Sequence, residues 1–92
     1  MPPEARPRVL VVDDDEDTRQ LIAFALGANR YQVVEVADGE AALQALRGAR
    51  FDLVITDYDM PGLTGAEMLK RATREGTLGD ASSLLVTAHP DP

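Results

Sequence analysis

The chain has 92 residues, of which 16 are acidic and 9 are basic, so its formal net charge is −7. This length makes one small domain, and the negative charge argues against direct binding to nucleic acid, since no basic stripe offsets the repulsion between the chain and phosphate. The chain has no cysteine, no signal-peptide core and no apolar run of the roughly 20 residues that a membrane span needs, so we expect a cytoplasmic protein without disulfides and without a membrane partner.

The first expected elements are a short arm, a strand and a helix. Residues 1–7 contain prolines and predict a flexible N-terminal arm. The continuous apolar run Val9–Val12 predicts a strand buried on both faces. Residues 18–26 then show helical spacing, and Gly27 stands where a helix C-cap belongs. The residues expected to face the core from this helix are Leu21, Ile22, Ala25 and Leu26.

The middle of the chain repeats the alternation of strand and helix. A second strand is expected over Tyr31–Val36, and Asp38 is placed to cap a helix over Gly39–Arg47. A third strand, Phe51–Thr56, is again apolar in its centre and ends on the carboxylate of Asp57. The third strand therefore resembles the first, Val9–Val12, in its continuous apolar centre.

The last part of the chain predicts one further helix and one further strand. Thr64 and Glu67 have the spacing of a capping box, which starts a helix that runs to about Glu75. Leu84–Thr87 predicts a fourth strand, and residues 90–92 form a proline-containing tail. The order β-α-β-α-β-α-β predicts an α/β fold with a doubly wound parallel sheet.

Carboxylates follow two of these strands directly. Asp13 and Asp14 close the first strand, and Asp57 closes the third. In open parallel sheets, ligands bind beyond the carboxyl ends of the strands. If the first and third strands are neighbours, the three carboxylates meet, and each raises the pKa of the others. A hard cation such as Mg²⁺, which prefers oxygen ligands, would relieve that conflict.

A simpler interpretation of the acidic run is also open. Acidic residues favour turns and the first turn of a helix, where the helix dipole stabilises them. The turn and helix-dipole interpretation explains the acidic residues 15–17 well, but it explains Asp13, Asp14 and Asp57 poorly.

Four segments carry a family pattern, in the right order and at the right spacing. They are Val9–Asp15, Val34–Ala42, Val54–Gly62 with Gly65, and Leu85–Ala88. Together they resemble the receiver domains of bacterial response regulators, over Arg8 to about His89. The resemblance implies a flavodoxin-like topology with strand order 2-1-3-4. It also implies an incomplete receiver domain over residues 8–89, because the family's last helix-strand-helix has no counterpart, as expected for a fragment or a truncated form.

The resemblance assigns roles to individual residues. It implies that Asp57 accepts a phosphoryl group from a sensor histidine kinase or a phosphotransfer protein. Asp14 aligns with a direct Mg²⁺ ligand, Asp13 with its partner, and the backbone carbonyl of Asp59 with another ligand. Thr87 aligns with the hydroxyl that turns toward the phosphoryl group. Such a domain is a phosphoacceptor with at most self-catalysed phosphotransfer and dephosphorylation, so we do not expect an enzyme.

Departures from the family pattern keep two alternatives open. The family has a lysine that pairs with the phosphoryl oxygens, whereas the only lysine here is Lys70, in the predicted third helix. A receiver-shaped interaction module that is not phosphorylated would fit that difference. Asp57-Tyr58-Asp59 also resembles the start of haloacid-dehalogenase phosphatases, although Pro61 stands where that family has Thr or Val.

The fourth strand is expected to have a bare outer edge. Edge strands with unpaired N–H and C=O groups pair readily with other chains, and large exposed apolar patches are uncommon on monomers. We therefore expect self-association, through the fourth strand Leu84–Thr87 or the uncovered sheet face.

Overall fold

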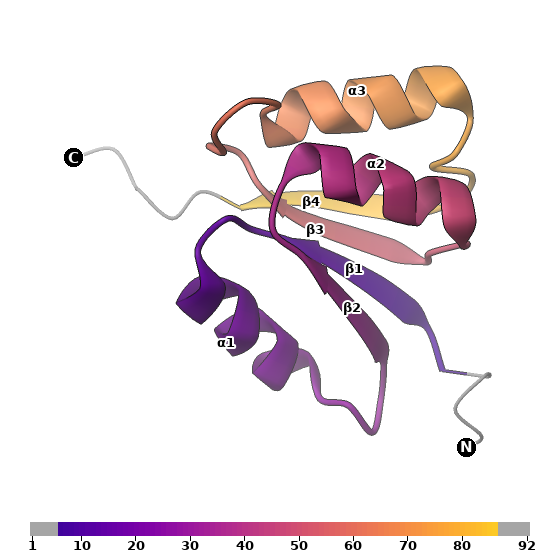
Figure 1. Ribbon diagram of the computed structural model, residues 1–92. Helices are drawn as coiled ribbons and strands as arrows, with labels where there is room; N and C mark the ends of the chain where they lie inside the picture. The colour runs from indigo at the N-terminus through magenta and orange to yellow at the C-terminus, as the bar shows by residue number, and fades with distance from the viewer. Residues whose placement is uncertain (1–5, 87–92) are drawn as a thin grey trace.

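The computed structural model describes residues 6–86 (Figure 1). Strands and helices alternate along the whole of this part of the chain. They are β1 Arg8–Val12, α1 Glu16–Leu26, β2 Gln32–Val36, α2 Gly39–Gly48, β3 Leu53–Asp57, α3 Gly65–Glu75 and β4 Ser82–Val86. Most of the predicted N-terminal arm, residue Thr87 and the tail 90–92 lie outside the described residues.

The strands form one parallel sheet in the order β2-β1-β3-β4. This confirms both the predicted fold class and the predicted strand order. Val12 of β1 pairs with Val36 of β2 on one side and with Thr56 of β3 on the other. The carboxyl ends of the three strands are therefore level.

Helices cover both faces of the sheet (Figure 1). On one face, Leu10 and Val12 pack with residues of α2 and α3 in the larger core cluster. On the other face, Val9 and Val11 pack against Ile22 and Leu26 of α1. The uninterrupted apolar sequence of β1 thus supplies both cores in turn, because successive side chains point to opposite faces.

The expected inner face of α1 is partly wrong. Ile22 and Leu26 pack on the sheet, but Leu21 is 67% exposed and Ala25 is also exposed. No residue of α1 is fully buried. Leu21 and Ala25 lie about 100° around the helix from Ile22 and Leu26. The contacts of α1 are mainly with β1 and β2, and Leu21 and Ala25 stay exposed on the side of the helix that faces away from these strands.

The boundaries of the later strands also differ from the prediction. β3 extends to Asp57, which pairs with Val86 of β4. β4 begins at Ser82 rather than at Leu84, because Ser82 and Ser83 pair with Leu53 and Val54 through main-chain groups that do not depend on the side chain.

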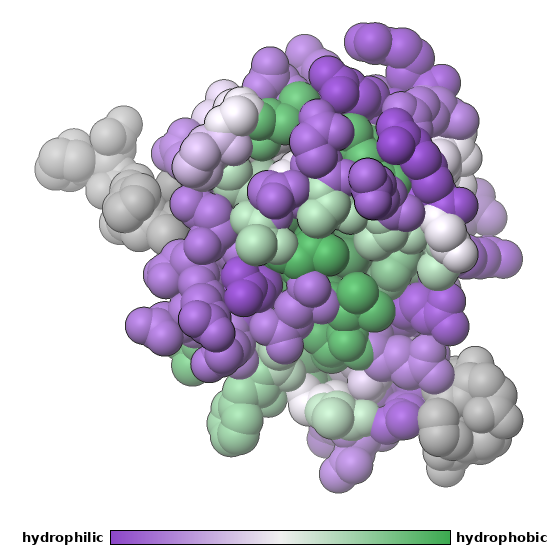
Figure 2. Space-filling view, viewed as in Figure 1, coloured by the Kyte–Doolittle hydropathy of each residue, from purple (hydrophilic) through white to green (hydrophobic). Residues whose placement is uncertain are grey.

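Helix ends follow the predicted signals. Asp38 accepts a hydrogen bond from the Ala41 amide at 2.7 Å, and Thr64 and Glu67 form the reciprocal capping box. In the view of Figure 2, hydrophobic residues gather in the middle of the visible face and hydrophilic residues surround them. None of the helices within residues 6–86 is long and apolar enough to cross a membrane.

Candidate functional site

Three carboxylates meet at the carboxyl edge of the sheet. Because Val12 pairs with Thr56, the residues that follow them, Asp13 and Asp57, leave β1 and β3 side by side. Carboxylate oxygens of Asp13, Asp14 and Asp57 all lie within 4.8 Å of one another. This confirms that the acids predicted from separate strands converge.

Asp13 is the most enclosed member of this acidic cluster, Asp13, Asp14 and Asp57. It is 3% exposed, and its Oδ1 accepts a hydrogen bond from the Asp15 amide at 2.9 Å. Burial raises the pKa of the Asp13 carboxyl, and the negative charges of Asp57 and Asp14 raise it further. A bound cation would therefore stabilise the ionised form of Asp13 that the fold by itself disfavours.

Asp57 is held at the end of β3 and is 7% exposed. Its Oδ1 accepts a hydrogen bond from the Asp59 amide at 3.2 Å. Tyr58 directly follows Asp57, and its amide donates to the Val86 carbonyl of β4 at 3.0 Å. The side chain and the following main chain are thus both fixed, while exposed Asp14 leaves the cluster open to solvent.

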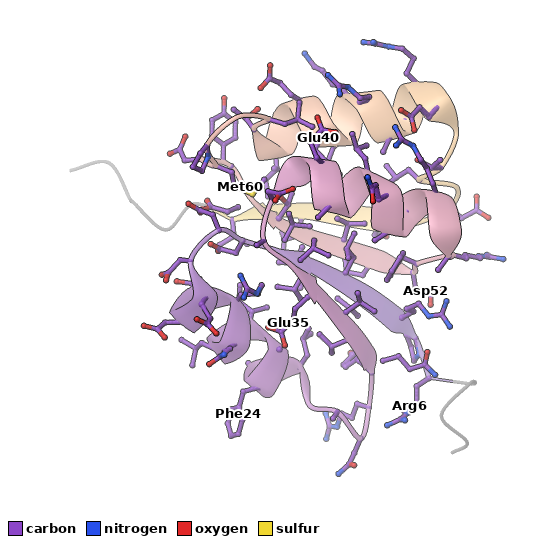
Figure 3. All side chains as sticks on the ribbon, in the orientation of Figure 1. Arg6, Phe24, Glu35, Glu40, Asp52 and Met60 are labelled. Carbon is purple, nitrogen blue, oxygen red and sulfur yellow. The ribbon has the colours of Figure 1, made fainter. Side chains whose placement is uncertain are left out.

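The loop after Asp57 is anchored on both sides. Met60, labelled in Figure 3, lies in this loop, is 6% exposed and packs into the larger core. The amide of Gly65, at the start of α3, donates to the Tyr58 carbonyl at 3.1 Å. Buried Thr56 donates from its hydroxyl to the Asp57 carbonyl at 3.0 Å. The loop therefore has little freedom to move the Asp57 carboxylate.

The acidic run from Asp13 onward divides into two functions. Asp15 is the N-cap of α1 and accepts hydrogen bonds from the Asp17 amide at 3.3 Å and the Thr18 hydroxyl at 2.6 Å. The Thr18 hydrogen bond lowers the pKa of Asp15. Glu16 and Asp17 occupy the first helical turn. The capping interpretation thus holds for residues 15–17, and the cluster interpretation holds for Asp13 and Asp14.

Other predicted site residues stand apart from this geometry. The Asp59 side chain is exposed and is not a member of the cluster, and the metal-binding role of its backbone carbonyl stays a prediction. Thr87 lies outside the described residues. Lys70 is exposed on α3, beside Leu63, Glu67 and Arg74, rather than among the three carboxylates.

Sequence reasoning missed Arg19. This residue of α1 donates from a guanidinium nitrogen to the Asp13 carbonyl at 2.9 Å. The only signal in the sequence is an arginine that stands in the second turn of a helix directly after the acidic run.

The donor set suits a hard divalent cation. Each member of the cluster offers carboxylate oxygen, and two of the three are buried. Mg²⁺ takes oxygen ligands, keeps several waters and is commonly held by one or two carboxylates. The residues present therefore fit a magnesium ion.

Comparisons with known proteins agree with this geometry. The family model of the response regulator receiver domain matches residues 9–92. Among curated proteins, the two-component response regulator ORR3 of Oryza sativa subsp. japonica is 36% identical over 91 residues, which cover 98% of this chain and 70% of that protein.

Solved receiver structures are similar in fold and sequence. The chemotaxis protein CheY4 of Vibrio cholerae has a TM-score of 0.86 at 35% identity, covering 96% of this chain and 73% of that one. The response regulator TrrA of Thermotoga maritima, solved in complex with Mg²⁺-BeF, has a TM-score of 0.81 at 35% identity, covering 90% of this chain and 70% of that one.

Proposed function

Because this chain belongs to the response-regulator receiver family, we propose that it accepts a phosphoryl group on Asp57 from the phosphohistidine of a sensor histidine kinase or phosphotransfer protein in the cytoplasm. One observation carries the proposal. The Asp57 carboxylate closes β3 within 4.8 Å of two further carboxylates, at the sheet edge where parallel α/β proteins bind ligands.

The chain's own residues supply a nucleophile and a rigid frame for it. A carboxylate oxygen of Asp57 attacks the phosphorus atom, so that a new O–P bond forms while the N–P bond to the donor imidazole breaks. The bonding electron pair goes to that imidazole nitrogen, which then takes up a proton. Phosphoryl transfer asks the protein mainly for positioning and charge neutralisation. In this proposal Asp57 is the phosphoacceptor, and the chain is a phosphorylated signalling domain and not an enzyme.

Four groups would hold the metal ion. They are the carboxylates of Asp13, Asp14 and Asp57 and the backbone carbonyl of Asp59. When bound, Mg²⁺ neutralises negative charge on the transferring group. The Mg²⁺-BeF complex of TrrA, a protein 35% identical to this chain, supports the choice of metal.

Thr87 is proposed to report the phosphorylated state. Its hydroxyl would donate a hydrogen bond to a phosphoryl oxygen. Val86 pairs with Asp57, and Thr87 follows Val86 in the sequence, which supports the assignment. Thr87→Ala is expected to leave phosphorylation intact and to blunt the conformational response to it.

The proposal is tested with a small phosphodonor. Acetyl phosphate and Mg²⁺ should label the wild-type chain, and Asp57→Asn should abolish the label because an amide is a poor nucleophile. Asp59→Asn is the matched control, since it changes a neighbouring carboxylate but keeps the backbone carbonyl. Equal labelling of Asp57→Asn and wild type would place the phosphoacceptor elsewhere.

One observation favours a second candidate function. Lys70 lies exposed on α3, so no lysine of the described residues joins the acidic cluster to pair with a phosphoryl group. A receiver-shaped module that binds partners without being phosphorylated would need none. A wild-type chain that acetyl phosphate fails to label, but that still binds a kinase, would favour this function.

We also propose that β4 joins two copies of this chain. Within residues 6–86, no strand pairs with the outer edge of β4, and Leu84 and Leu85 are 52% and 45% exposed. A second copy offers the same edge, and a two-fold axis pairs the two β4 strands in antiparallel fashion. Such pairing satisfies the open main-chain groups and brings the exposed leucines of both copies together.

A further inference from the structure

Arg19 links three elements around the acidic cluster. From α1, its guanidinium donates to the Asp13 carbonyl at the end of β1, with a nitrogen–oxygen distance of 2.9 Å. Its Nε lies 3.4 Å from a carboxylate oxygen of Glu35 on β2. Figure 3 shows Glu35 on the side of the sheet that faces α1. The Arg19 side chain is only 17% exposed, so both contacts lie in a partly desolvated place.

The Asp13 carbonyl depends on this contact. The Asp13 amide continues the sheet ladder by donating to the Val36 carbonyl of β2 at 3.2 Å. The Tyr58 amide, which follows Asp57 in the neighbouring strand, donates to Val86 of β4 instead of turning toward β1. Buried carbonyls need a partner, and for Asp13 the guanidinium of Arg19 is that partner.

We propose that Arg19 is a positioning residue for the metal site. The carbonyl that it holds belongs to the peptide unit between Asp13 and Asp14, so fixing that oxygen fixes the plane from which the Asp14 side chain leaves. Rotation of this plane would turn the Asp14 carboxylate out of the cluster. The inference rests on the proposed function, in which Asp14 and Asp57 hold Mg²⁺.

The contact requires arginine and not only a positive charge. A guanidinium presents several N–H donors in a rigid fork, whereas a lysine ammonium is a point charge on a flexible stem. Arg19 uses this fork to contact the Asp13 carbonyl and the Glu35 carboxylate at once. Lysine would keep the charge but would lose the fixed direction of the bond.

Charge and positioning predict opposite effects on metal affinity. If Arg19 acted only through its charge, removing it would strengthen Mg²⁺ binding, because a cation beside the carboxylates repels the metal. If Arg19 positions Asp14, its removal weakens Mg²⁺ binding. Groups that orient metal ligands typically contribute about 10-fold or more to affinity, which is larger than the charge effect at a solvent-open site.

The test combines an NMR titration with Mg²⁺ and backbone relaxation measured without metal. Arg19→Gln and Arg19→Lys should each bind Mg²⁺ about 10-fold more weakly than wild type. In both variants the Asp14 amide should become more mobile before any metal is added. Arg30→Gln removes the same charge from an exposed loop residue and should match wild type. Glu35→Gln keeps the bond to the Asp13 carbonyl and should stay within about threefold of wild type, since only the ion pair is lost.

Each result decides a separate point. Unchanged Asp14 amide mobility in Arg19→Gln, or tighter Mg²⁺ binding by that variant, would overturn the positioning role. Wild-type affinity in Arg19→Lys would overturn the requirement for the guanidinium fork. If the wild type binds no Mg²⁺ while Arg19→Gln still loosens the Asp14 amide, the proposed metal site fails and the anchoring of the Asp13–Asp14 peptide stands.

Discussion

Gly65 packs its Cα directly against the main chain of Asp57. A Cβ atom added at Gly65 would overlap the Asp57 carbonyl oxygen and would stand 3.0 Å from the Thr56 hydroxyl oxygen. The start of α3 therefore rests on the residue proposed as phosphoacceptor. No flexible side chain lies between them that could move to make room.

Gly65→Ala is expected to destabilise the fold and to displace the end of β3. Overpacking of a rigid site typically costs about 1–3 kcal/mol, and urea unfolding measures that loss. Labelling of Asp57 by acetyl phosphate should fall as well. Gly48→Ala is the matched control, because nothing lies within 4 Å of a Cβ added there. A Gly65→Ala chain as stable as wild type would contradict the close packing.

The capping box predicts acid sensitivity at the start of α3. Hydrogen bonds from Thr64 lower the pKa of Glu67 below its ordinary value of 4.5. A lowered carboxyl pKa means that the contribution of Glu67 to stability is present above pH 4.5 and is lost as the pH falls through the lowered value. Urea unfolding of wild type and Glu67→Gln, over a range of pH values above and below 4.5, measures this contribution.

In that comparison, glutamine keeps a capping hydrogen bond but does not titrate. The difference in stability between the two proteins should therefore shrink as the pH falls. A difference that stays constant across the range would show that Glu67 is not the titrating group.

Self-association through β4 predicts a concentration-dependent sedimentation coefficient. Ser82 donates to Asp52 of the connection before β3, and Val86 accepts from Tyr58, so the alternate residues Ser83 and Leu85 turn their main-chain groups to the open edge. Ser83→Pro removes one outward amide without removing a bond to β3. This substitution should shift the chain toward monomer, while the circular dichroism spectrum of the variant should stay close to that of wild type.

The matched control for the edge is on β2. Val34 is 38% exposed on the other edge strand, and Val34→Thr should leave the association of wild type unchanged. A wild-type chain that sediments as a monomer at high micromolar concentration, with slow exchange of the Ser83 and Leu85 amides, would contradict the β4 contact.

The sequence predicts the parts of this fold that depend on local chemistry. The apolar run from Val9 to Val12 suits a strand that is buried on both faces, and Thr64 with Glu67 marks the start of α3 by spacing alone. The convergence of Asp13 with Asp57 follows once β1 and β3 are neighbours. The strand and the helix start need only residue type and spacing, whereas the convergence also needs the strand order.

Other features depend on which elements meet, and periodicity does not contain that information. Leu21 has the spacing of a core residue in the helix, yet it is exposed because Ile22 and Leu26 form the side of α1 that packs on the sheet. Arg19 looks like an ordinary helix residue until the end of β1 is placed beside it. The demand for glycine at position 65 likewise arises only when α3 approaches the main chain of Asp57.

Mapping the phosphorylated residue tests the central claim most directly. The wild-type chain is incubated with acetyl phosphate and Mg²⁺, the acyl phosphate is reduced with borohydride, and the modified position is identified by peptide mass spectrometry. We predict modification at Asp57 alone, and its loss when EDTA removes the metal. Modification at Asp13 or Asp14, or equal modification of Asp57 with and without EDTA, would contradict a metal-assisted phosphoacceptor at the end of β3.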